Sequence, residues 1–263
     1  MFELIIEFAE LKNIFLDSFN VFLFILYLND VIIYSTIKTI TVIFLNKVEG
    51  VKMKLAIIGA TGKSGNRILN EALLRHLDVT AIVRSPEKLS ANVPIIQRDA
   101  FSITAEDLAP FDVIISAFGN VAGETREAHV DIVKHYLEIL KNSHKRILLV
   151  GAASYLYTDE KRTKKLYDTL WMRTAGLRSG SLVLERAYLT MKENAVGFDW
   201  TFIAPAVNYE ASGPRTGHYQ IGSDVVLNNA AGKSVISYAD LAVALMDEVE
   251  RPKHLNMLAA VAN

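Results

Sequence analysis

The segment from Lys54 to Gly65, K-L-A-I-I-G-A-T-G-K-S-G, contains the residues whose types and spacing are best suited to holding a phosphate group. Its glycines, Gly59, Gly62 and Gly65, recur at intervals of three. In a strand–turn–helix unit the first allows a tight turn, the second lets the backbone approach a pyrophosphate, and the third lets the helix pack against the strand. Further donors are offered by three side chains of the loop, Thr61, Lys63 and Ser64. We therefore expect a dinucleotide site here, and a tight turn without a ligand is the alternative.

A basic turn follows the next apolar run, in V-R-S-P-E-K. In NAD-binding sheets this place usually carries an acid that accepts hydrogen bonds from the ribose 2′-OH. Here Arg84, Ser85 and Lys88 take its place, and a guanidinium suits a 2′-phosphate. The turn predicts NADP, as NADPH, with NAD as the second choice and a solvated basic turn as the alternative. Asp99 and Ala100 follow the third apolar run, where we expect the adenine edge; a simple turn is the alternative for Asp99.

Two further segments are predicted to border the cofactor because each ends a strand. Small residues in S-A-F-G let the backbone pass close to a ligand, so we expect Ala117, Phe118 and Gly119 beside the ribose and phosphates. Pro205 and Val207 follow the sixth predicted strand and are expected to form a wall of the nicotinamide pocket. Ligands of parallel sheets bind at the carboxyl ends of the strands, which is where all of these residues fall.

Ser154, in G-A-A-S after the fifth predicted strand, is the candidate catalytic residue. It is the only hydroxyl so placed beside the expected nicotinamide, and a helix-capping serine is the alternative.

His218 is the one histidine near the predicted ligand edge and is a weaker candidate for substrate contact. Four other histidines fall on helices or at their ends and are expected to be surface or packing residues: His76, His129, His135 and His144. No two histidines stand at metal-ligand spacing, so we expect no metal.

Strands alternate with helical patterns from Met53 onward, which is typical of βαβ units and a parallel sheet. We predict a Rossmann-like, doubly wound α/β fold with a single domain over residues 53–263. Helices are expected after the glycine loop, over Arg126–Lys141, within Lys161–Asn194 and from Ser237. The expected strands are Leu55–Ile58, Val79–Val83, Pro94–Ile96, Val113–Ala117, Ile147–Val150, Trp200–Ile203 and Ser234–Ile236.

Residues 1–52 differ from the rest and form a hydrophobic N-terminal extension. A transmembrane helix needs about 20 consecutive apolar residues, whereas Asn29 and Asp30 separate two shorter runs and Lys38 interrupts the second. A signal peptide fits poorly, because acidic residues occupy the part that should be basic. We favour a mis-assigned start or dispensable leader, since Met53 directly precedes the first strand. Membrane or surface contact through residues 1–52 is the alternative.

The composition of the chain argues against several classes of site and partner. The 263-residue chain has a net charge of −1, which gives no electrostatic reason to expect a nucleic-acid partner. It contains no cysteine, so disulfides, thiolate zinc sites and cysteine nucleophiles are excluded. This composition is compatible with a reducing cytoplasm, which is the location we expect. The oligomeric state stays open.

The segments G-A-T-G-K-S-G, V-R-S-P-E-K-L, S-A-F-G, G-A-A-S-Y-L, W-T-F-I-A-P and R-T-G-H-Y-Q-I together resemble the atypical short-chain dehydrogenases with an NAD(P)H-binding domain. Within that family the chain is most similar to proteins described as NADH-flavin reductases, and through them to flavin/biliverdin-IXβ reductase. The resemblance covers residues 53–263. It implies NAD(P)H-dependent reduction of a flavin, a quinone or a related flat acceptor.

Two departures from the family limit what the resemblance implies. Alcohol-oxidising short-chain dehydrogenases use Tyr-x-x-x-Lys, with the tyrosine as acid, but Trp171 stands four residues after Tyr167. Tyr157 and Lys161 have the right spacing, but lie too close to the strand end, and we interpret the match as chance. Biliverdin-reducing relatives carry a histidine where this chain has Val207, which argues against biliverdin as substrate.

The sequence thus favours an NADPH-dependent reductase that passes hydride directly to a small, flat acceptor, a reaction in which positioning supplies most of the effect. The main rival is a non-catalytic, NADP-sensing regulator similar to NmrA-type proteins, which keep the dinucleotide fold without turnover. A weaker rival is a sugar-nucleotide epimerase, which should contain the missing Tyr-x-x-x-Lys pair.

Overall fold

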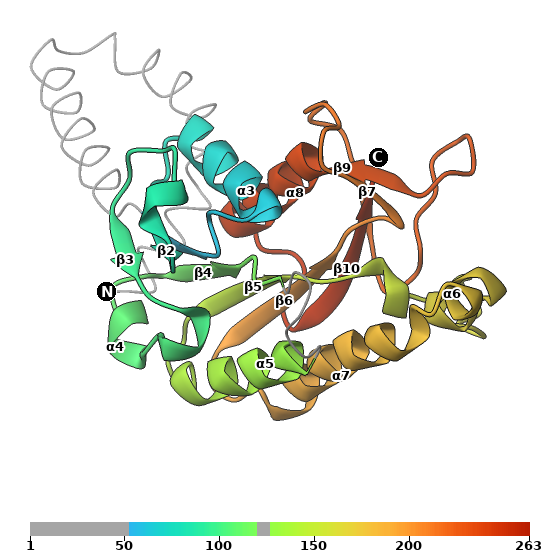
Figure 1. The fold of residues 1–263 in the computed structure, drawn as a ribbon, viewed down its shortest axis with the longest axis horizontal. Helices are drawn as coiled ribbons and strands as arrows, with labels where there is room; N and C mark the ends of the chain where they lie inside the picture. The colour runs from blue at the N-terminus through green and yellow to red at the C-terminus, as the bar shows by residue number, and fades with distance from the viewer. Residues whose placement is uncertain (1–52, 120–126) are drawn as a thin grey trace, which may run out of the picture. The chain divides into compact units, whose positions relative to one another are not determined.

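The computed structural model describes residues 53–119 and 127–263, and the predicted extension 1–52 lies outside the described residues (Figure 1). In this part of the chain, strands form a sheet in the order β3-β2-β1-β4-β5-β6-β10-β8. All neighbours in it are parallel except β8, which runs antiparallel to β10. The strands are β1 Lys54–Ile58, β2 Asp78–Val83, β3 Ile95–Gln97, β4 Val113–Ser116, β5 Arg146–Val150, β6 Asp199–Ala204, β8 Gln220–Gly222 and β10 Met257–Ala262.

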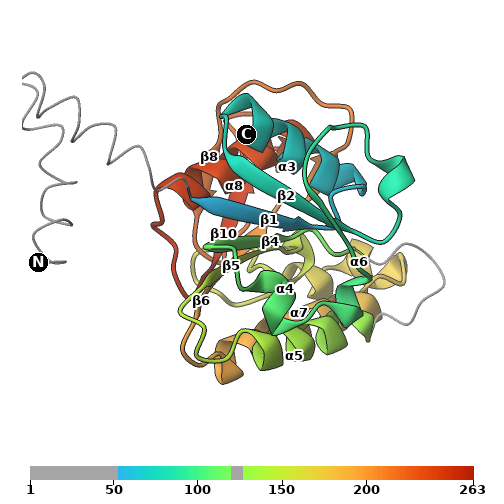
Figure 2. The same ribbon diagram turned by 90° about the vertical axis from the view of Figure 1, so that its left-hand side faces the viewer.

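Helices cover both faces of this sheet, as Figures 1 and 2 show from two directions. One face carries α3, Lys63–Leu74, packed against α8, Tyr238–Glu250. The other carries α5, Ala128–Ile139, packed against α7, Arg178–Asn194. The short helices are α4, Ala105–Leu108, and α6, Leu170–Thr174. A separate apolar core fills each of the two interfaces, so the predicted Rossmann-like, doubly wound fold is confirmed.

Strand β1 is the centre of the arrangement. Its apolar run from Leu55 to Ile58 is at most 2% exposed, as expected for a strand covered on both faces. It pairs with β2 on one side and β4 on the other. Because the chain turns back past β1 to reach β4, the strand order reverses between these two strands. In such sheets the ligand crevice lies at this reversal, beyond the carboxyl ends of the strands.

The structure corrects several predicted boundaries. Residues 161–165 were predicted as helix but form an irregular segment. Within it, Lys164 O accepts a hydrogen bond from the preceding Thr158 N–H at 2.9 Å. This stretch, K-R-T-K-K, is polar throughout, so it has no apolar face with which to pack as a helix. The predicted strand Ser234–Ile236 is β9, Val235–Ser237, and it pairs with β7, Asn208–Glu210, in a small separate sheet. Strands β7, β8 and β10 were not predicted.

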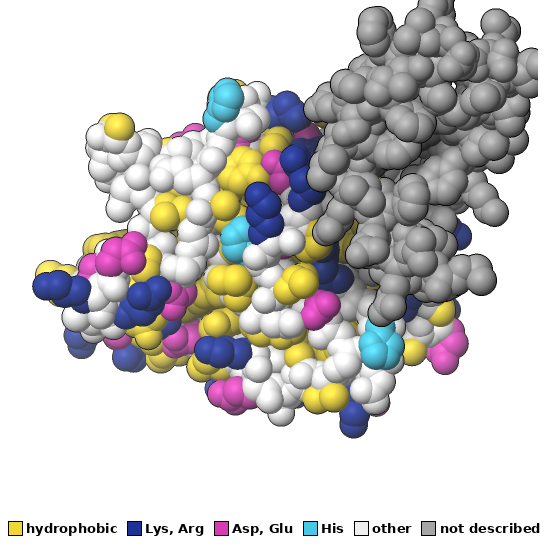
Figure 3. All heavy atoms as spheres, turned by 180° about the vertical axis from the view of Figure 1, so that it is seen from behind, with side chains coloured by type: hydrophobic (Ala, Val, Ile, Leu, Met, Phe, Trp, Pro, Cys, Tyr) yellow, Lys and Arg dark blue, Asp and Glu magenta, His cyan; other side chains and the backbone are white. Residues whose placement is uncertain are grey.

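On the face shown in Figure 3, acidic and basic side chains are interspersed among hydrophobic ones over the described residues. No helix within 53–119 and 127–263 has both the length and the apolarity to cross a bilayer.

Candidate active site

The glycine loop has the geometry that its spacing predicts. Gly59 adopts a φ of +78°, a left-handed conformation that side chains rarely tolerate. A Cβ on Gly65 would lie 2.1 Å from the carbonyl oxygen of Gly59, so only glycine allows α3 to pack this closely on the end of β1. Gly62 N–H donates to that same oxygen at 2.9 Å and closes the turn.

The first turn of α3 is open to an anion. Gly62 precedes the helix and provides no side-chain cap. The N–H groups at the start of a helix have no partner within it, and they attract phosphate together with the positive end of the helix dipole. Lys63 is exposed and Thr61 half-buried beside them. The loop therefore has the backbone geometry expected of a pyrophosphate site, which stays a prediction.

Ser64 has a second role that the sequence did not indicate. Its hydroxyl is 2.9 Å from the hydroxyl of Tyr209 on β7, and Tyr209 stacks on Tyr238 with ring centroids 3.7 Å apart. Further along α3, the buried carboxylate of Glu71 accepts two hydrogen bonds from Arg215, at 2.7 and 2.9 Å. These contacts hold α3 against residues far along the chain.

Arg84 lies exposed at the end of β2, with Nη1 3.5 Å from Oδ2 of Asp99. The other oxygen of Asp99 accepts from Phe101 N–H at 3.0 Å, so Asp99 is a turn residue as well. Ser85 is half-buried and directly precedes the short 3₁₀ turn Pro86–Lys88, which its side chain does not cap. Ala100 is the first residue of the 3₁₀ turn that follows β3. The structure thus brings together the residues predicted for the ribose 2′ position and for adenine.

A cavity of about 690 Å³ lies beyond the carboxyl ends of β5 and β6. Ser154, Pro205 and Val207 line it, as do Tyr209 and the apolar side chains of Met172 and Leu177. Ser154 lies inside the 3₁₀ turn Ala153–Tyr155 and not at its N-cap. Its Oγ is buried and has no hydrogen-bond partner, so no capping bond of this hydroxyl exists among the described residues. We call this space the acceptor cavity.

A smaller cavity of about 250 Å³ adjoins it and has Gly151, Ala152, Leu184 and His129 in common with it. Ser64 of the glycine loop and the segment Ala117–Gly119 line this second space. The predicted phosphate side and the predicted acceptor side are therefore connected through shared walls. We call this space the cofactor cavity.

Residues 59–252 match the family model described as NAD(P)H-binding. The chain belongs to this family. YwnB of Bacillus subtilis (strain 168), an uncharacterized protein, is 43% identical over 206 residues, which cover 78% of this chain and 95% of YwnB. The predicted family resemblance is confirmed, and a nicotinamide dinucleotide is the cofactor class that the family and the loop geometry share.

Solved structures of similar sequence have the same fold. A "putative NADH-flavin reductase" from Streptococcus pneumoniae TIGR4 superimposes with a TM-score of 0.75 at 34% identity, over 80% of this chain and 99% of that chain. A "putative epimerase" from Bacteroides thetaiotaomicron reaches a TM-score of 0.68 at 32% identity, over 81% of this chain and 97% of that chain. The two descriptions differ in chemistry, so the side chains in the cavities must decide between them.

This member of the NAD(P)H-binding family has no tyrosine–lysine pair at the acceptor cavity within the described residues. The hydroxyl of Tyr167 donates to Glu185 at 2.7 Å, and Tyr167 is absent from the cavity wall. Tyr157 has Lys165, and not Lys161, over its ring, at 3.8 Å from the centroid. The interpretation of Tyr157 and Lys161 as a chance match is consistent with this geometry.

His129 is the cavity residue that sequence reasoning missed. It was expected to be a surface or packing residue, but it lines both cavities and contacts the ring of Phe118 edge-on at 5.4 Å between centroids. Burial lowers its pKa, so the imidazole is uncharged near neutral pH. The signal that could have found it is its place at the start of α5, at the ligand edge of the sheet. His218 is exposed and lines neither cavity.

Proposed function

We propose that the protein is an NADPH-dependent reductase of a flat conjugated acceptor, such as a flavin or a quinone. The observation that carries this proposal is the Ser154 hydroxyl, which is buried at the wall of the acceptor cavity without a partner. Buried polar groups are nearly always hydrogen-bonded. A hydroxyl kept free beside the predicted nicotinamide position is therefore suited to donate to a ligand.

The bound nicotinamide supplies the hydride, and the residues of the chain supply positions and contacts. The glycine loop and the first turn of α3 hold the pyrophosphate. The small residues Gly151 and Ala152, shared by both cavities, leave room for a ring beside the cofactor. Ser154 donates to the acceptor atom that gains electron density as hydride arrives. Met172 and Leu177 add apolar walls that limit access of water to the reacting rings.

The preference for NADPH rests on the Arg84 guanidinium, which is 74% exposed and free to reach a 2′-phosphate. The nearby carboxylate of Asp99 weakens this preference, because the carboxylate repels the 2′-phosphate. We give the greater weight to Arg84, because a guanidinium can form a charge-assisted, bidentate contact with a phosphate. The streptococcal relative is described with NADH, so the choice of cofactor needs its own measurement.

The absence of a tyrosine–lysine pair from the described cavity wall favours a reductase over a sugar-nucleotide epimerase, because the epimerase should contain that pair at the substrate. An NADP-sensing regulator of the NmrA type needs no such residue either, and is the second candidate. We place the reaction in the cytoplasm, where reduced nicotinamide cofactors are regenerated.

The test is NADPH oxidation by the full chain with FMN, FAD and small quinones. Loss of one donor in the transition state costs roughly 1–3 kcal/mol, about five- to a hundred-fold in rate. Ser154→Ala should therefore lower turnover while NADPH affinity stays unchanged. Ser90→Ala, at an exposed serine outside both cavities, is the matched control. Tight NADPH binding with no oxidation by any acceptor would support the regulator instead. A lower melting temperature with unchanged turnover would make Ser154 structural.

A further inference from the structure

Tyr209 connects the wall of the acceptor cavity with the glycine loop. Its side chain lines the acceptor cavity, and its hydroxyl is 2.9 Å from the hydroxyl of Ser64. Ser64 lies in the first turn of α3 and lines the cofactor cavity. The reaction proposed above uses Ser154 and gives Tyr209 no part. One side chain thus reaches from the predicted ring site to the predicted phosphate site.

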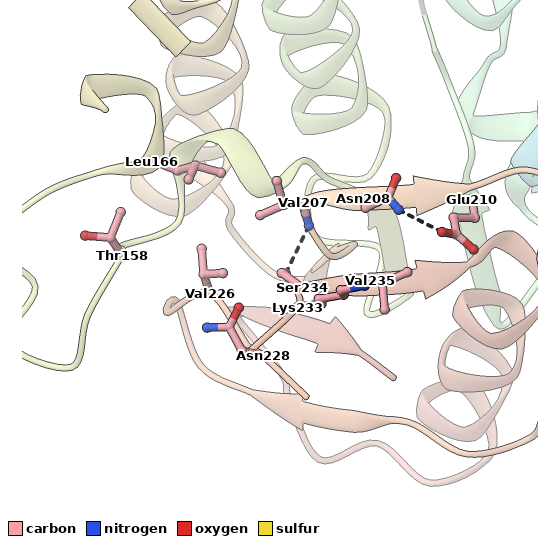
Figure 4. A pocket seen from close by; sticks show the side chains of 10 residues that line it. All are labelled: Thr158, Leu166, Val207, Asn208, Glu210, Val226, Asn228, Lys233, Ser234 and Val235. Atoms are coloured by element: carbon pink, nitrogen blue, oxygen red, sulfur yellow. Dashed lines mark hydrogen bonds between the residues drawn. The ribbon is translucent and has the colours of Figure 1, made fainter. Parts of the chain in front are cut away.

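The strand that carries Tyr209 is held in place on both of its faces. Successive side chains of a strand point to opposite faces. Asn208 and Glu210 therefore point away from the face of Tyr209, and the amide of Asn208 donates to Glu210 at 2.7 Å (Figure 4). The strand, β7, is paired with β9. On the face of Tyr209, its ring stacks on Tyr238 with 3.7 Å between centroids. Packing of this kind fixes the position of the Tyr209 hydroxyl before a ligand binds.

The paired hydroxyls of Tyr209 and Ser64 have one proton more than their shared hydrogen bond needs. Each hydroxyl has a single proton to donate and can also accept. If Tyr209 donates to Ser64, the proton of Ser64 stays available for a third group. Burial raises the pKa of the Tyr209 phenol, so the phenol keeps its proton. A phenol is also more acidic than an aliphatic alcohol, which makes Tyr209 the better donor of the pair.

The available proton of Ser64 lies where an anion is expected. The N–H groups in the first turn of α3 have no partner within the helix, and together with the helix dipole they attract phosphate. The Ser64 hydroxyl, in the same turn and at the cofactor cavity, adds one more donor. Hydrogen bonds in a chain polarise one another. The bond from Tyr209 should therefore strengthen when Ser64 donates to a charged oxygen.

We propose that Tyr209 is a positioning residue for the cofactor, which donates to Ser64 and so directs the Ser64 hydroxyl to an oxygen of the pyrophosphate. This inference rests on the proposed place of the pyrophosphate at the glycine loop, and not on the reduction of any acceptor. A bond that only tied β7 to α3 would be equally strong with and without the cofactor, and its loss would cancel from the cofactor affinity. The proposed bond strengthens on binding, so its loss does not cancel.

The test is a double-mutant cycle of Tyr209→Phe and Ser64→Ala in the full chain. Dissociation constants for NADPH and NADH and the melting temperature are measured for each variant. Tyr209→Phe keeps the stacked ring, and it should weaken both cofactors equally, by about two- to ten-fold, since both contain the pyrophosphate. In the Ser64→Ala background the same change should cost less than about two-fold. Tyr238→Phe, the same change on the neighbouring ring, which lines neither cavity, is the control and should leave both affinities unchanged.

The other outcomes would overturn this role of Tyr209. Unchanged affinity in Tyr209→Phe or in Ser64→Ala, even with a lower melting temperature, would make the hydroxyl pair a structural tie only. An undiminished loss in the Ser64→Ala background would mean that Tyr209 contacts the cofactor directly. A loss for NADPH alone would place the effect at the 2′-phosphate. In these three cases the reductase proposal stands, whereas a wild type that binds neither dinucleotide would refute both proposals.

Discussion

Replacing Gly65 with alanine is the sharpest test of how α3 is held at the cofactor site. The new Cβ would lie 2.1 Å from the Gly59 carbonyl oxygen, 2.8 Å from its carbon and 3.0 Å from the Ala60 Cα. All three atoms belong to the backbone, so the helix must move by about 1 Å to reach ordinary contact distances. The Gly59 oxygen cannot yield alone, because it accepts the Gly62 N–H that closes the turn.

The change in folding stability caused by Gly65→Ala follows from two opposing effects. Alanine in a helix is favoured over glycine by up to about 1 kcal/mol. Overpacking against a rigid backbone costs roughly 1–3 kcal/mol, and here the clash is severe, so we expect Gly65→Ala to be destabilising by at least 1 kcal/mol. For a domain of this size that lowers the melting temperature by about 2–4 °C per kcal/mol. Displacement of the helix start should also weaken NADPH binding by about ten-fold or more.

Thermal unfolding and NADPH titration on the same variant check both effects. Gly119→Ala is the matched control for thermal stability alone, because no atom of the described residues lies within 4 Å of its added Cβ and its φ is not in the left-handed range. The control should keep the wild-type melting temperature. An unchanged or higher melting temperature for Gly65→Ala, with full NADPH affinity, would refute the close packing of α3 on the end of β1.

Three further predictions concern other parts of the chain. Arg84→Ala should weaken NADPH about ten- to a hundred-fold and NADH little, whereas Arg251→Ala, at an exposed arginine of the α8 end, should change neither; equal losses for both cofactors would contradict the assignment. Deletion of residues 1–52 should leave a folded, NADPH-binding protein, and precipitation or loss of binding would show that our boundary is wrong. Hydrogen bonds from Arg215 hold the pKa of Glu71 below its ordinary value, so its stabilising contribution is present above about pH 4.5 and is lost as pH falls through the lowered pKa. Stability curves of wild type and Glu71→Gln should therefore differ at neutral pH and converge in acid, and parallel curves would refute this linkage.

Much of the fold could be predicted because its signals are local. The apolar run of β1 and the glycine spacing determine a strand, a turn and a helix within twelve residues. The last strand, β10, was missed because its sequence M-L-A-A-V-A contains three alanines, which have low β-propensity. Its place beside β6 is set by tertiary packing. Residues 161–165 show the opposite failure, since lysine and arginine favour helices but this polar stretch has no apolar face to bury.

The candidate site likewise contains residues that the sequence could predict and residues that it could not. Gly59, Ser154 and Val207 could be placed because parallel topology brings strand ends to one edge. His129 was missed although the helix that carries it was predicted, because the sequence does not show that this side chain lines the two cavities. The pairing of β7 with β9 could not be predicted, although a strand close to β9 was, because more than twenty residues separate the two strands. The pairing of strands that are far apart in the sequence is therefore the part of the fold that sequence periodicity cannot predict.

The contacts of α3 have a consequence for the order in which the protein can become functional. Ser64 bonds to Tyr209 and Glu71 to Arg215, 145 and 144 residues further along the chain. Arg75, on the same helix, reaches Asp247 of α8 at 2.6 Å. A ribosome must therefore complete most of the chain before this helix, which we predict to receive the pyrophosphate, has all its supports. Because the entropy of closing such long loops must be paid before the contacts form, we expect the start of α3 to be fully held only late in folding.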